Sequence, residues 1–179
     1  MPLCYRKPEM RSLCTLLILT AALVATEMNR PMQRFLLPDV NGHDHDSIEW
    51  KGRPMLLEFM STSCVHCAAF TSVLKQVQQK YGDRLVIVAM VNPPDTPANV
   101  SRFTQEHKVT YPILLDAGRA AYAYIRKPAF DIPFIFLIDS SGTIRESFEY
   151  SATTADLFYG NALFAHIDRL LGASFRASN

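Results

Sequence analysis

Two cysteines three residues apart, Cys64 and Cys67, stand between an apolar run and a helical pattern, and no other feature constrains the fold as strongly. Residues 55–60 predict a buried strand and residues 68–77 a helix. The first sulfur would then lie at the helix N-terminus, where unpaired N–H groups and the helix dipole favour an anion. The second cysteine follows one turn later, within reach of the first. We therefore expect a dithiol–disulfide site, with a Cys64–Cys67 disulfide in its oxidised form.

A zinc site is the alternative interpretation of the same pair. It would need two further thiol or imidazole ligands. The only other cysteines are Cys4 and Cys14, both in the N-terminal segment, so redox chemistry is favoured. A length of 179 residues indicates one domain with a substantial core, and a formal net charge of +1 does not suggest a nucleic-acid partner.

Residues 1–26 read as a targeting segment rather than as part of the fold. Arg6, Lys7 and Arg11 precede a nearly continuous apolar run at residues 13–24, and small residues follow. The pattern is typical of a secretory signal peptide or an uncleaved membrane anchor, and the short run favours cleavage. Residues 27–179 would then form the domain, with Cys64 and Cys67 its only cysteines. Such an exported protein is expected to act on disulfides of other proteins.

The remaining chain alternates strand and helix patterns, which predicts an α/β fold with a mixed central sheet flanked by helices. Thr96 and Asp116 are expected to cap two of the helices. The apolar stripe from Leu157 to Leu171 predicts one closing helix, stopped by Gly172. The other expected strands cover residues 84–91, 111–116, 132–139 and 143–148, and the other helices residues 64–81, 97–108 and 117–124.

Three charged or imidazole side chains leave alternatives open. Glu58 interrupts the apolar strand, so it is either a solvated edge residue or a buried proton acceptor beneath the cysteines. His43 and His45 flank an aspartate after the turn signal Asn41-Gly42. A solvated turn is favoured over a metal site there, because no third ligand is obvious nearby.

Further motifs accompany the cysteine pair. They are Phe35-x-Leu37-x-Asp39-x-x-Gly42, Lys51-Gly52-Arg53-Pro54, Tyr111-Pro112-Ile113-Leu114-Leu115-Asp116 and Pro133-x-x-Phe136-Leu137-Ile138-Asp139-x-x-Gly142. With them, residues 34–171 resemble the thioredoxin superfamily, and within it the exported TlpA-like thiol–disulfide oxidoreductases, which include reductases of cytochrome c maturation. The resemblance implies a thioredoxin-like domain with a helix-and-strand insertion at about residues 92–125.

The resemblance also implies roles for individual residues. Cys64 would be the attacking thiol, Cys67 the resolving thiol and Glu58 the buried acid that exchanges protons with it. Pro133 would be a cis-proline that faces the disulfide. Ile132 would present its backbone to an extended substrate peptide, and Val65, between the cysteines, would contact the substrate. No cofactor beyond the redox-active disulfide and no metal is expected.

Two residues depart from the TlpA-like pattern. Ser63 stands where tryptophan usually precedes the first cysteine, so the wall beside the site is altered. His66 stands directly before the second cysteine, as in disulfide-forming members of the superfamily. A histidine that stabilises the thiolate there makes the disulfide a stronger oxidant, and the alternative is a surface residue with only a slight effect. The direction of the reaction therefore stays open, with a reductase slightly favoured.

The sequence thus predicts an extracytoplasmic thiol–disulfide oxidoreductase. It would be periplasmic, soluble after cleavage or tethered to the inner membrane, with protein thiols as substrates and a membrane redox partner. The alternative is a thioredoxin-like metal-binding or copper-delivery module that uses Cys64, Cys67 and a histidine. A peroxidase is disfavoured, because the chain lacks the Pro-x-x-x-Thr-x-x-Cys pattern.

Overall fold

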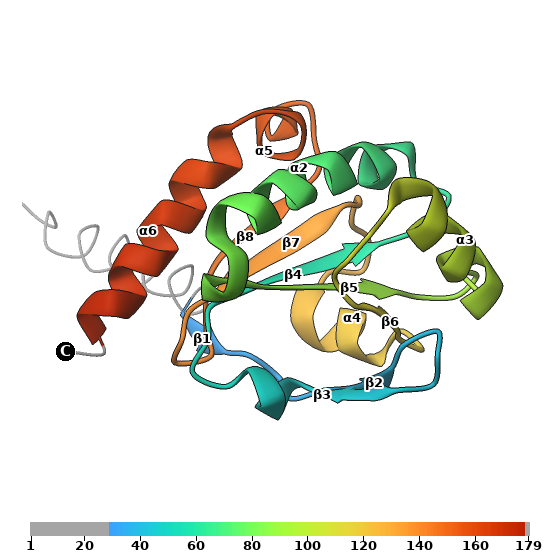
Figure 1. Cartoon of the computed structure of the whole chain (residues 1–179), viewed down its shortest axis with the longest axis horizontal. Coiled ribbons are helices and arrows are strands. Elements are labelled where there is room, and N and C mark those ends of the chain that lie inside the picture. Colours follow the sequence, from blue (N-terminus) through green and yellow to red (C-terminus); the bar gives the residue numbers. More distant parts are fainter. Residues whose placement is uncertain (1–28, 178–179) are drawn as a thin grey trace, which may run out of the picture.

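A mixed sheet of six strands, in the order β1-β8-β7-β4-β5-β6, organises the computed structural model, which describes residues 29–177 (Figure 1). β4, β5 and β6 run parallel, whereas β7 pairs antiparallel with β4 and β8. The predicted α/β fold with a mixed central sheet is confirmed. The sheet strands are β1 (Arg30–Pro31), β4 (Met55–Met60), β5 (Val86–Val91), β6 (Ile113–Leu115), β7 (Phe134–Ile138) and β8 (Thr143–Glu149), and β2 (Leu36–Pro38) and β3 (Asp44–Asp46) form a separate hairpin.

Helices cover both faces of this sheet, which explains why every residue of β4, β5 and β7 is buried (Figure 1). Four helices pack on one face around a core that includes Cys67, and the fifth packs on the other against an aromatic-rich core. The first group is α2 (Val65–Tyr81), α3 (Pro97–His107), α5 (Ala155–Tyr159) and α6 (Ala162–Ala177), and the second is α4 (Arg119–Ile125).

Side chains satisfy the N–H groups at the helix starts where the sequence predicted caps. The Thr96 hydroxyl accepts from Asn99 N at 3.3 Å, with Pro97 in the first helical position. The Asp116 carboxylate accepts from Ala120 N and Ala121 N at 3.2 and 3.0 Å. Gly82 ends α2 with a φ of +52°, which glycine adopts without strain.

The prediction of one closing helix stopped by Gly172 is wrong. The chain forms two helices, α5 and α6, separated at Gly160, whose backbone is extended. A Cβ at Gly160 would lie 2.0 Å from Asp156 Oδ1, so a larger residue would require the Asp156 side chain to move. α6 continues past Gly172 to Ala177, because a glycine inside a helix costs only about 1 kcal/mol. Burial of Leu163, Ile167 and Leu170 along this helix outweighs that cost.

The predicted targeting segment, residues 1–26, lies outside the described residues. Within residues 29–177, none of the helices combines the length and the apolar character that a membrane span requires.

Candidate functional site

Cys64 and Cys67 occupy the first turn of α2, one accessible and one enclosed. Cys64 is the N-cap residue, and its sulfur accepts a hydrogen bond from Cys67 N at 3.2 Å. Cys64 is partly exposed, whereas Cys67 is 0% exposed. Both are free thiols here, so the structure represents the dithiol form and the disulfide stays a prediction. An exposed thiol at a helix N-terminus beside a buried thiol has the arrangement that disulfide exchange requires.

The loop before β7 brings a backbone carbonyl to the accessible sulfur. β7 pairs antiparallel with β4, so its first residues lie at the end of β4 that leads to Cys64. The Ile132–Pro133 peptide bond is cis, the geometry that the resemblance implied. Cys64 Sγ donates to Ile132 O at 3.6 Å. Val65, 74% exposed, leaves an apolar side chain open beside the pair. Peptide binding by Ile132 and Val65 stays a prediction.

Glu58 is buried, with 1% of its surface exposed, so the solvated alternative is wrong. Alternate residues of β4 face the core beneath α2, and this register places Glu58 there between Leu56 and Met60. Neither carboxylate oxygen has a hydrogen-bond partner among the described residues. Burial disfavours the charged form and raises the pKa of Glu58 to about 8. The carboxyl is therefore poised to exchange a proton near neutral pH.

Cys67 is held as a thiol. Burial raises its pKa, and the nearby negative charge of Glu58 and a hydrogen bond with Cys64 raise it further. Because the thiolate is the nucleophile, Cys67 needs a base before it can attack. Glu58 is the carboxylate whose charge acts on it.

Two tyrosines hold the His66 ring. It stacks on Tyr150 with centroids 4.0 Å apart and an interplanar angle of 21°, and its Nδ1 hydrogen-bonds the Tyr159 hydroxyl. The Tyr159 hydroxyl also donates to the Tyr150 hydroxyl at 3.4 Å. This contact is the main cause that raises the pKa of Tyr159 to about 12. Sequence reasoning missed both tyrosines, since only the fold brings the residue after β8 and the end of α5 to the start of α2.

The wall beside Cys64 is polar, as Ser63 predicted. The Ser61 and Ser63 hydroxyls lie 3.0 Å apart. Thr62 N donates to the Asp95 carboxylate at 3.1 Å, which ties the turn before Cys64 to the loop after β5. Asp95 was not predicted, although the Pro93-Pro94 turn before it marks a loop at the same edge of the sheet.

His43 and His45 lie at the β2–β3 hairpin. His45 Nε2 is 3.3 Å from Asp39 Oδ2, and its ring stacks on Trp50. His43 Nδ1 is 3.7 Å from the same oxygen, and its side chain is exposed. No group of three potential metal ligands occurs among residues 29–177.

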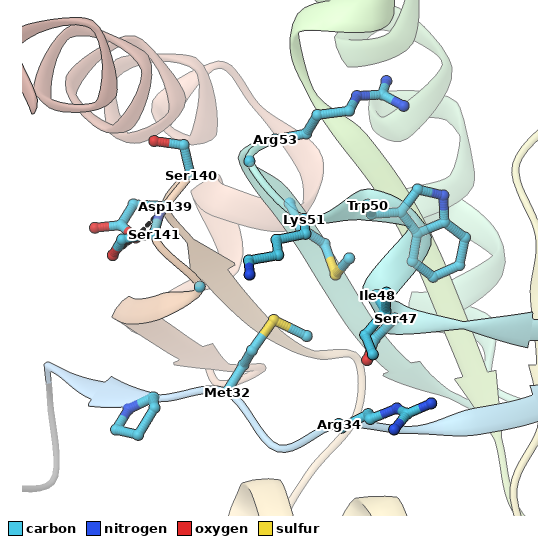
Figure 2. Close-up of a pocket in the computed structure, with 14 residues that line it drawn as sticks. Met32, Arg34, Ser47, Ile48, Trp50, Lys51, Arg53, Asp139, Ser140 and Ser141 are labelled. Atoms are coloured by element: carbon cyan, nitrogen blue, oxygen red, sulfur yellow. Dashed lines mark hydrogen bonds between the residues drawn. The ribbon is translucent and has the colours of Figure 1, made fainter. Parts of the chain in front are cut away.

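A cavity of about 230 Å³ lies at the opposite end of β4 from the cysteines (Figure 2). Met32, Trp50 and Lys51 line it, together with Met55, the first residue of β4. It has no contact with the candidate redox residues, because β4 separates its lining from Cys64.

The family model described as AhpC/TSA family matches residues 28–147. That range contains Glu58, both cysteines and Pro133, whereas Tyr150 and Tyr159 fall outside it. Among curated proteins, the thiol-disulfide oxidoreductase ResA of Geobacillus kaustophilus is 27% identical over 124 residues, covering 69% of this chain and 70% of that protein.

Solved structures share the fold. The thiol:disulfide interchange protein of Chlorobium tepidum is 23% identical with a TM-score of 0.61, covering 82% of this chain and 96% of that one. The secreted disulfide oxidoreductase of Mycobacterium tuberculosis is 20% identical with a TM-score of 0.57, covering 66% and 84%. These likenesses confirm the thioredoxin-like fold that the sequence predicted.

Proposed function

Because this chain belongs to the AhpC/TSA family of thioredoxin-like proteins, we propose that it is a thiol–disulfide oxidoreductase that exchanges disulfides with protein substrates through Cys64 and Cys67. One observation carries the proposal. An accessible thiol touches the Ile132 carbonyl, and a buried thiol and a buried carboxyl lie behind it. An extended peptide laid along Ile132 would bring its disulfide to Cys64.

Reduction of a substrate would proceed in two steps. The Cys64 thiolate attacks one sulfur of the substrate disulfide, forms a mixed disulfide and releases the other substrate sulfur as a thiolate. Glu58 then takes the proton of Cys67, and the Cys67 thiolate attacks Cys64 Sγ. The second substrate sulfur leaves as a thiolate. The substrate disulfide has then been reduced by two electrons, and the Cys64–Cys67 dithiol has been oxidised to a disulfide. The reverse sequence oxidises substrate dithiols.

The setting that we propose is extracytoplasmic. The basic and apolar pattern of residues 1–26 supports export, by a cleaved signal or a retained anchor. The likeness to a secreted disulfide oxidoreductase supports the same location. In the periplasm a membrane redox partner would renew the dithiol, and cytochrome c maturation is the process expected from the TlpA-like resemblance.

The reduction potential of the Cys64–Cys67 couple decides the direction, and we expect a reductase. Equilibration of the full chain with glutathione buffers should give a value near that of thioredoxin, about −270 mV. A value near about −120 mV, typical of strong periplasmic oxidants, would instead make the protein a disulfide donor.

We expect His66→Ala to lower the reduction potential by about 30 mV or more, because an imidazole on the first turn of α2 favours the Cys64 thiolate and so the reduced form. Tyr159→Phe is the matched variant. It keeps the ring beside His66 and removes the hydroxyl that Nδ1 contacts, so a smaller shift in the same direction is expected. Equal potentials in all three proteins would show that His66 is a surface residue without influence on the couple.

A further inference from the structure

Four polar side chains form a buried cluster beneath the first turns of α2, and we call Glu58, Cys67, Thr71 and Tyr111 the buried polar cluster. Their exposed fractions are 1, 0, 1 and 5%. Cys67 and Tyr111 belong to the apolar core on this face, and the Thr71 hydroxyl donates to Cys67 O at 3.1 Å. The proposed mechanism uses neither Thr71 nor Tyr111, and Tyr111 is the titratable residue of the two.

Strand register explains how Tyr111 reaches this place. Glu58 pairs with Ala89 on β5, and Ala89 pairs with Ile113 on β6. Ala89 N also donates to Pro112 O at 3.0 Å, which fixes the chain directly after Tyr111. Side chains two residues apart share a face of a sheet, so Tyr111 and Ile113 both point toward α2, the face on which Glu58 lies.

Three atoms of the buried polar cluster are unsatisfied. The Tyr111 hydroxyl and both Glu58 carboxylate oxygens are buried, without a hydrogen-bond partner among the described residues. Leaving buried polar groups unpaired is unfavourable, and one buried water that contacts both side chains would satisfy them. The phenol offers a donor and the carboxylate offers only acceptors, so the two groups are complementary.

The neighbours of Glu58 restrict which groups can act on it. Across β5 and β7 it faces Ala89 and Ile135, which are apolar. The titratable groups that sense its charge are Cys67 on α2 and Tyr111 before β6. Burial raises the pKa of Tyr111 well above its usual value, and the Glu58 charge raises it further. The neighbouring Thr71 hydroxyl lowers this pKa only in part, so the phenol keeps its proton and remains a donor.

We propose that Tyr111 is a positioning residue of the redox site, whose hydroxyl donates through a buried water to the Glu58 carboxylate and so stabilises that carboxylate as the base for Cys67. This inference rests on the proposed function for its role in turnover, but the hydrogen bond itself can be tested without any substrate.

In the resolving step the phenol holds the water and gives up no proton. The Cys67 proton moves to the Glu58 carboxylate, which becomes a neutral carboxyl. The Cys67 thiolate attacks Cys64 Sγ of the mixed disulfide, a Cys64–Cys67 bond forms, and the substrate leaves as a thiolate. Without the phenol, the Glu58 carboxylate loses a hydrogen-bond donor and its pKa rises. A larger fraction of Glu58 is then protonated at neutral pH, and less of it is available as a base.

Tyr111→Phe removes only the hydroxyl, and Tyr81→Phe is its matched control. Tyr81 lies in the same core, is 3% exposed, and its hydroxyl donates to Asp168 at 2.9 Å, away from Glu58. Infrared spectroscopy of the reduced full chain follows the C=O band of the protonated buried carboxyl as pH rises, with Glu58→Gln to assign it. We expect Tyr111→Phe to move the midpoint upward by about one pH unit and Tyr81→Phe to leave it in place. Equal midpoints for wild type and Tyr111→Phe would overturn the proposal.

A kinetic experiment separates this inference from the proposed function. Decay of a preformed mixed disulfide between Cys64 and a thiol reagent is measured against pH. We expect Tyr111→Phe to slow it several-fold near pH 7 and to recover the wild-type rate at high pH. A uniform loss at every pH would point to a merely structural role and contradict the proposal. If the wild type exchanges no disulfides but the infrared shift is present, the proposed function fails and the Tyr111–Glu58 hydrogen bond stands.

Discussion

Replacing Cys64 by serine should abolish both reduction of insulin disulfides and oxidation of substrate dithiols, a loss of at least about 10³-fold. The hydroxyl of serine forms no thiolate and no mixed disulfide, so neither direction can begin. The fold should be unaffected, because Cys64 is a partly exposed N-cap residue and serine is a good residue at that position. Thermal unfolding of the variant alongside the activity assay checks this point.

Cys67→Ser is the matched variant for this experiment. Its Cys64 thiol still attacks, but resolution is lost, so a mixed disulfide with the substrate should accumulate and be visible on non-reducing gels. Cys64→Ser should trap none. Retained activity in Cys64→Ser, or trapping by Cys64→Ser in place of Cys67→Ser, would reject the assignment of the two thiols.

Replacing Glu58 by glutamine should flatten the dependence of stability on pH and stabilise the reduced protein by roughly 4 kcal/mol near pH 8. The pKa of Glu58 is raised from 4.5 to about 8, so between these values the folded state holds a proton that the unfolded state has lost. Folding therefore takes up a proton, and the free energy of unfolding of the wild type falls as pH rises through this window. Glutamine carries no charge and removes that slope.

Urea unfolding at several pH values between 5 and 8 measures the effect, with the reduced protein throughout. The range stops below the ordinary titration of an unfolded thiol, so Cys67 adds little to the slope. Glu106→Gln, which changes an exposed carboxylate on α3, is the control and should keep the wild-type slope. If the free energy of unfolding of the wild type stays constant or rises from pH 5 to 8, the prediction is contradicted. Glu58 would then ionise in the folded protein as easily as in the unfolded chain.

The elements around the cysteines could be predicted from the sequence because their signals are local. The apolar run of β4, the N-cap position of Cys64 and the glycine after Tyr81 each act within a few residues, and the structure has the strand, the turn and the helix where these signals place them. The closing helix was mispredicted for the opposite reason. Its apolar stripe continues past Gly160, whereas the chain is interrupted there by one residue with an extended backbone, which the periodicity of the apolar residues does not reveal.

Features that depend on which strands lie side by side escaped sequence reasoning. Burial of Glu58 could not be decided from β4 alone, since α2 and β5 enclose the carboxyl. The contact of His66 with Tyr159 joins residues 93 positions apart. Tyr111 was noted as part of a motif, but its place beneath Cys67 follows from the pairing of β5 with β6. Such contacts have no period or spacing that a single sequence displays.

Trp50 is the only tryptophan, and it packs beside His45 and Phe35 before β4, whereas Cys64 follows that strand. The six residues of β4 separate the indole from the thiols by about 20 Å. Its fluorescence should therefore report unfolding without being quenched or enhanced when the dithiol is oxidised. Intrinsic emission thus offers a clean optical signal for comparing the stability of the oxidised and reduced forms, and the redox state itself has to be followed by thiol labelling.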